Sequence, residues 1–199
     1  MAIAKTTLLT ALNADLLRSE TNIDTYIMRA LFDLSGRALW KDLHTSDTAT
    51  IAQGKTSFAV PSDIRVLDEI TLNDGTHEGE PLTVAAWREI LAQREGQQSQ
   101  GEPTQYRYRG RSIQFHPQAD AAYTATTWYW KWCLDPDDID FGDTFLTALI
   151  YATQAFYLTG KGLTADPKFP EVWANYRNAL SDLSGEVDQQ SRQVVYRNI

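Results

Sequence analysis

The hydrophobic pattern of this chain changes its period twice, and this change constrains the fold more than any other feature. Apolar residues recur at helical spacing through the first forty residues, in steps of two between Thr48 and Cys133, and at helical spacing again from Phe145. We therefore expect an α+β protein whose helical bundle is built from residues 1–45 and 140–187. Residues 46–139 are expected to form an inserted β-rich domain, hairpin- or sandwich-like with one short helix, and residues 188–199 a C-terminal segment.

Local signals place the individual elements. The expected elements are helices at 3–18, 23–40, 84–94, 145–158 and 170–187, hairpins at 48–60 and 105–116, and strands at 66–73 and 123–133. Thr21 or Asn22 is expected to cap the second helix, Thr83 the short helix, and Gly36 to mark a close approach between helices or a bend. The second helix has a stripe of Ile23, Ile27, Leu31 and Leu34; the last has a predicted seam of Trp173, Tyr176, Leu180, Leu183 and Val187.

Composition excludes several classes of function. The chain of 199 residues carries 26 acidic and 18 basic residues, a net charge of −8, which argues against non-specific nucleic-acid binding. No apolar run approaches the roughly 20 residues of a membrane span, and the N-terminus lacks the pattern of a secretory signal. The single Cys133 excludes an internal disulfide framework. His44, His77 and His116 lie in unrelated contexts, so we expect no metal, no cofactor and no catalytic residue.

Two other groups of residues allow more than one interpretation. Four carboxylates, Asp135, Asp137, Asp138 and Asp140, could hold a metal for an enzyme, but they lack the glycine and glutamate of a calcium loop, and a solvated turn is favoured. Three tryptophans, Trp128, Trp130 and Trp132, alternate on one predicted strand face, with Tyr129 and Lys131 on the other. Exposed, they would suit a carbohydrate-binding or host-recognition module; we favour their burial between the sheet and the helices.

Two segments are candidate partner contacts. Arg107, Arg109 and Arg111 surround one face and the turn of the second hairpin, where they either protect a sheet edge or bind another protein. The C-terminal segment contains β-prone residues after a polar stretch, and it either frays or adds a strand to a partner's sheet. The residues expected to dock are Val194, Val195, Tyr196, Arg197 and Ile199.

The order of landmarks resembles the head-to-tail adaptor, or connector, proteins of tailed bacteriophages and related gene-transfer particles. The likeness lies in residues 60–63 (VPSD) before the strand at 67–72, in Pro81-Leu82, and above all in residues 101–120 (GEPTQYRYRGRSIQFHPQAD). An apolar helix at 145–158 ahead of a charged helix at 170–187 completes it. Together these landmarks cover roughly residues 5 to 187.

This resemblance implies a non-enzymatic virion protein, made in the bacterial host cytoplasm, that forms a ring, typically a dodecamer, beneath the portal at the capsid vertex. The ring would extend the DNA channel and present its far side to a stopper, nozzle or other tail protein. The C-terminal segment would reach towards the portal. An acidic lumen would let DNA pass without sequence-specific binding, and the subunits would meet through heterologous contacts that close by rotation.

Overall fold

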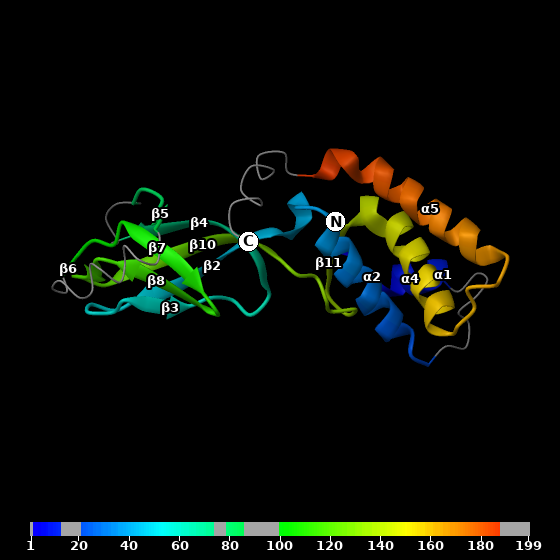
Figure 1. The fold of residues 1–199 in the computed structure, drawn as a ribbon, viewed down its shortest axis with the longest axis horizontal. Coiled ribbons are helices and arrows are strands. Elements are labelled where there is room, and N and C mark those ends of the chain that lie inside the picture. The colour runs from blue at the N-terminus through cyan, green and yellow to red at the C-terminus, as the bar shows by residue number, and fades with distance from the viewer. Residues whose placement is uncertain (1, 13–20, 74–78, 86–99, 188–199) are drawn as a thin grey trace. The chain divides into compact units, whose positions relative to one another are not determined.

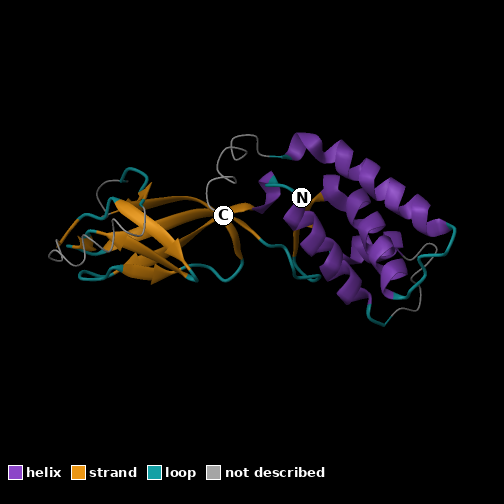
Figure 2. Cartoon of the chain, viewed as in Figure 1, coloured by secondary structure: helices purple, strands orange, loops and turns teal. Residues whose placement is uncertain are grey.

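The computed structural model describes residues 2–12, 21–73, 79–85 and 100–187 of the chain. The fold is α+β, as predicted, and it divides into two compact units, one of residues Met1–His44 with Lys131–Ile199 and one of residues Thr45–Trp130 (Figures 1 and 2). We call these the helical unit and the β unit and describe each by itself.

The helical unit is organised around helix α4. Its described helices are α1 (Lys5–Leu12), α2 (Ile23–Arg37), α4 (Leu146–Gly160) and α5 (Lys168–Asp182), with short 3₁₀ helices η1 (Lys41–Leu43), η2 (Asp143–Phe145) and η3 (Leu183–Glu186). Helix α4 packs against α1, α2 and α5 (Figure 1). A helix with neighbours on several sides must be apolar on several faces, which accounts for the near absence of charge in α4.

A small sheet closes the helical unit. Strand β1 (Ala2–Ile3) pairs antiparallel with β11 (Ile139–Gly142), and Val187 forms an isolated antiparallel bridge with Trp40. The predicted first helix is therefore wrong at its start, because Ile3 belongs to this strand; its continuation past Leu12 lies outside the described residues.

The second helix confirms its predicted stripe, since Ile27, Leu31 and Leu34 are fully buried. Two details differ from expectation. Asn22 occupies the N-cap position, yet its side chain makes no capping hydrogen bond. Gly36 approaches no helix: a Cβ there would lie 3.7 Å from the ring of Trp132.

The last helix buries a face that is shifted from the predicted seam. Val172, Tyr176 and Ala179 are buried, whereas Trp173 and Leu180 are half-buried. The α-helix ends at Asp182, before the predicted 187, and buried Leu183 begins η3. Small side chains permit the closest approach to α4, so the face is centred on Val172 and Ala179 and the larger Trp173 flanks it, where it meets Phe156 and Phe169 edge-on.

The β unit is a sandwich of a three-stranded and a four-stranded sheet. The first has the order β2 (His44–Ile51), β10 (Tyr123–Lys131), β4 (Ile64–Asn73); the second has β3 (Ser57–Ala59), β8 (Ser112–His116), β7 (Gln105–Arg109), β5 (Thr83–Val84). Short strands β6 (Gln100–Gly101) and β9 (Gln118–Ala119) pair parallel. Both sheets contribute to one core, which contains Ile70 and Leu72 from one sheet and Ile113 and Phe115 from the other.

One predicted element of this unit is wrong, and a second is wrong at its start. The segments on either side of Gly54 do not form a hairpin, because β2 joins the three-stranded sheet and β3 the four-stranded one. Gly54 turns the chain between the sheets with a φ of 78°, and its N–H donates to the carbonyl of Ala119. The predicted short helix cannot begin at Val84 with Thr83 as its cap, because Thr83 and Val84 form β5, which pairs parallel with β7. The rest of that predicted helix falls in residues 86–99, which lie outside the described part.

Candidate partner-binding surfaces

The β7–β8 hairpin forms as predicted, residue for residue, and it presents the arginines. Tyr106 lies opposite Phe115, and both side chains are in the core. Because side chains alternate along a strand, Arg107 and Arg109 point to the other face of the sheet. Arg107 is half-buried and Arg109 is exposed. Burial raises the pKa of the Tyr106 hydroxyl, helped by the carboxylates of Asp68 and Glu69.

The tip of the hairpin is a two-residue turn of Gly110 and Arg111. Arg109 pairs with Ser112, and Gly110 has a φ of 62°, which suits a tight hairpin turn and disfavours any residue with a side chain. Tyr108, Arg109 and Arg111 are exposed around it. Tyrosine and arginine are the residue types that protein–protein interfaces favour, so this tip is suited to contact another protein.

The three tryptophans do not share one environment, and the prediction of a face common to all three is wrong, because only Trp128 and Trp130 belong to strand β10. Trp128 is 39% exposed and Trp130 only 1% exposed. Trp132 lies beyond the end of β10, in the helical unit, where it stacks on Phe32 at 4.8 Å with an interplanar angle of 14°. Because Trp130 is buried, the three rings form no exposed platform, and the carbohydrate-binding alternative is not supported.

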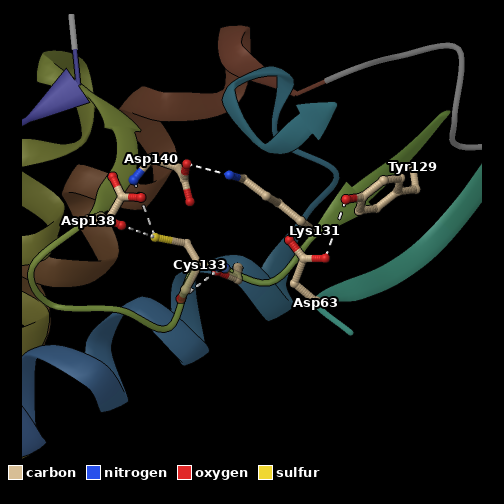
Figure 3. A network of polar contacts seen from close by, with 7 residues as sticks. Asp63, Tyr129, Lys131, Cys133, Asp138 and Asp140 are labelled. Atoms are coloured by element: carbon tan, nitrogen blue, oxygen red, sulfur yellow. Dashed lines mark hydrogen bonds and ion pairs between the residues drawn. The ribbon is translucent and has the colours of Figure 1, made fainter. Parts of the chain in front are cut away.

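Tyr129, on the other face of β10, is also buried. Its hydroxyl donates to the carboxylate of Asp63 at 3.3 Å (Figure 3). Burial, reinforced by that carboxylate, raises the pKa of Tyr129 to about 12. The hydroxyl therefore remains a donor that fixes the chain after β3 to strand β10.

Three of the four carboxylates of residues 135–140 make contacts within the fold. Lys131 pairs with Asp140 at 2.5 Å, Lys5 pairs with Asp137 at 2.7 Å, and the side chain of Asp135 accepts the backbone N–H of Asp137 at 2.9 Å (Figure 3 shows the first pair). No group of three or more histidine, cysteine or acidic side chains is placed to hold a metal ion among the described residues. The arrangement is that of a turn stabilised by ion pairs.

Cys133 lies beneath this turn. The backbone N–H of Asp140 donates to its sulfur at 3.4 Å, and the backbone N–H of Cys133 donates to the Ser35 hydroxyl at 3.2 Å (Figure 3). Burial raises the pKa of the Cys133 thiol to about 12. A thiol that stays protonated is a poor nucleophile, so Cys133 is a core residue.

The C-terminal docking residues Val194, Val195, Tyr196, Arg197 and Ile199 lie outside the described residues. The last described residue, Val187, is itself extended, with φ −78° and ψ 130°, and bridges to Trp40.

Sequence reasoning missed a second set of surface residues. Met28 and Phe32 of α2, together with Leu134, are exposed. Met28 and Phe32 fall off the buried stripe of α2, and apolar residues on a second face of a helix are the signal that could have identified them.

Taken together, these features define a class of protein: an α+β chain whose candidate sites are surfaces for other proteins. Residues 4–197 match the model of the SU10 adaptor protein family, so the chain belongs to this family of phage head–tail connector adaptors. No curated protein matches the sequence. The family gives the chain a structural role in the phage particle, in contact with other head and tail proteins. No described helix is long and apolar enough to cross a membrane.

Proposed function

We propose that the chain assembles into a ring, a dodecamer when complete, that joins the portal at the capsid vertex to the phage tail and extends the DNA channel. The observation that carries this proposal is the family match, which covers residues 4–197 of the 199. The ring binds the portal on one side and a stopper, nozzle or other tail protein on the other.

The charge of the chain supports a channel role. Each subunit has a net charge of −8, and a ring multiplies this charge around its lumen. Like charge keeps the phosphate backbone from adhering to the wall, so DNA passes without sequence-specific binding.

In this proposal the C-terminal segment docks on the portal. Val187 starts it in an extended conformation, and the twelve residues after it reach about 40 Å when fully extended. Val194, Val195, Tyr196, Arg197 and Ile199 then add to a sheet edge of the portal, where backbone hydrogen bonds supply the affinity and alternate side chains the specificity.

Co-assembly of the full chain with the portal ring tests this assignment. A chain ending at Val187 keeps the bridge to Trp40 and is expected to lose portal binding. The matched control keeps residues 194–199 and replaces 188–193 with a flexible linker of equal length; it is expected to bind. Equal portal binding by the truncated chain would show that the segment does not dock.

The β7–β8 hairpin with Arg107, Arg109 and Arg111, which we call the arginine hairpin, is proposed to contact an acidic surface of a head or tail protein. Arg109→Glu and Lys55→Glu change the net charge equally, and both residues are exposed. They lie at opposite ends of the four-stranded sheet, because Arg109 pairs with Ser112 while Thr56, next to Lys55, bonds to Phe115. Arg109→Glu is expected to weaken recruitment of the partner at low salt and Lys55→Glu to leave it unchanged. Equal effects would mean that only the total charge matters.

A further inference from the structure

An apolar groove of about 400 Å³ opens on the helical unit. It is lined by Met28, Arg29, Phe32, Asp33, Leu134 and Phe156. Met28 is 44% exposed, Phe32 55% and Leu134 42%. Three of the seven large hydrophobic side chains that are exposed among the described residues therefore gather at one place, a pattern typical of an interaction surface.

The exposed ring of Phe32 is held in place by its neighbours. It stacks on Trp132, whose ring lies over Gly36, one turn further along α2, at a position where an added Cβ would be 3.7 Å away. Phe156 makes an edge-on contact with Trp173, with 6.1 Å between the ring centroids, and this contact restricts its movement. The groove is thus preorganised, which lowers the entropic cost of binding.

The two charged residues at the rim of the groove differ, because only one of them forms an ion pair within the described part of the protein. Asp33 is neutralised within the protein, since Arg37 contacts it at 2.6 Å and the Tyr176 hydroxyl donates to it at 2.5 Å. Across the described ranges, Arg29 forms no ion pair. Within the described part of the chain, the rim therefore presents one cation without a carboxylate partner, which is able to pair with a carboxylate of another molecule.

We infer that this groove receives the neighbouring copy of the same chain and is one half of the subunit contact in the ring. The inference rests on the proposed ring. A second copy carries a surplus of eight negative charges, so it offers the carboxylate that Arg29 lacks. Two copies of an acidic chain repel each other. They repel least where they meet through a surface that is apolar at its centre and positively charged at its rim.

The contact is heterologous. The groove of one copy meets a different surface of the next, which leaves that copy's own groove open for a third, and rotation closes the ring. A groove variant accordingly keeps its other contact surface and acts as a terminator when mixed with the native chain.

The first test uses ring assembly on the portal, counted by electron microscopy. Phe32→Asp removes the central aromatic from an exposed site, and the fraction of assembled rings is expected to fall about tenfold or more. Leu163→Asp, which removes an apolar side chain of similar exposure outside the groove lining, is the matched control and is expected to assemble normally. Circular dichroism confirms that both variants are folded. Normal ring assembly by Phe32→Asp would overturn the inference.

A second test does not depend on a damaging variant. Phe32→p-benzoylphenylalanine is introduced in full-length chain, and equal amounts of ¹⁴N- and ¹⁵N-labelled protein are assembled and irradiated. Cross-links that join a light to a heavy peptide of this chain support the inference. If rings form but position 32 reacts only with the portal, only within one copy or not at all, the groove is not the subunit contact and the ring stands. If the native chain forms no ring on the portal, the proposed function itself fails.

Discussion

The hydroxyl of Tyr176 joins helix α5 to helix α2 through the carboxylate of Asp33. The donor–acceptor distance is 2.5 Å, and the guanidinium of Arg37 lies 5.2 Å from the centre of the same ring. Burial, then the adjacent carboxylate, raises the pKa of Tyr176 well above its ordinary value, so the hydroxyl remains a donor at every pH the fold tolerates. Tyr176→Phe keeps the ring, its packing and the stacking of Arg37 on it, and it removes the hydroxyl together with its hydrogen bond to Asp33.

The size of the effect follows from what remains around Asp33. A hydrogen bond to a charged group contributes about 1.5–3 kcal/mol. Asp33 keeps both contacts with Arg37, at 2.6 and 3.1 Å, and its side chain is 27% exposed, so water replaces part of the loss. We therefore expect the lower end, about 1.5 kcal/mol, or roughly a tenfold change in the unfolding equilibrium constant and a fall of about 3–6 °C in Tm.

Urea unfolding followed by circular dichroism at 222 nm measures this change, because all the described α-helices lie in the helical unit. Tyr151→Phe, on half-exposed Tyr151 of α4, is the matched control and is expected to shift stability by less than about 0.5 kcal/mol. A Tyr176→Phe variant as stable as this control would refute the reasoning, because it would mean that the hydroxyl–carboxylate bond contributes no net stability.

Three further predictions concern single positions. Gly36→Ala is expected to stabilise the protein by about 0.5 kcal/mol in thermal unfolding, because helix propensity improves and the new Cβ meets the Trp132 ring at an ordinary 3.7 Å; a lower Tm contradicts this. Gly110→Ala is expected to cost about 1 kcal/mol in the same assay because of its positive φ, whereas Gly185→Ala, with open space around it, should cost less. Burial raises the pKa of the Cys133 thiol to about 12, so the stability of the fold is highest below pH 9, where the thiol is protonated in both states, and falls as the pH rises from 9 towards 12. At pH 8 the native protein should react with a thiol reagent far more slowly than the urea-unfolded protein. Equal rates would contradict the burial of Cys133.

The elements that local pattern determines were predictable. The stripe of α2 and the apolar helix α4 follow from spacing alone, and the β7–β8 hairpin follows because its two strands are joined by a two-residue glycine turn. Pairing between distant strands is different. β2 lies beside β10, which follows it by more than seventy residues, and no nearby signal distinguishes that partner from the adjacent β3.

The surfaces were less predictable than the fold. An apolar residue on a helix has the same appearance in the sequence whether it faces a core or a partner. The second apolar face of α2 marks Phe32 and Met28 as unusual, but only the burial of Ile27 and Leu31 shows which of the two faces is turned to the core. The prediction that three tryptophans share one strand face was wrong for a related reason. Alternation assigns a common face only while the strand continues, and β10 ends at Lys131, before Trp132.

In the proposed ring each chain holds copies of itself and other particle proteins at the same time, which requires surfaces that do not compete. The groove and the arginine hairpin differ in both chemistry and location, since the groove residues belong to the helical unit and the hairpin to the β unit. An apolar contact depends little on salt, whereas a contact through Arg109 and Arg111 weakens as salt screens it. Raising the salt concentration should therefore release the hairpin's partner while the ring persists, and a ring that dissociates together with that partner would show that both contacts rely on the same charges.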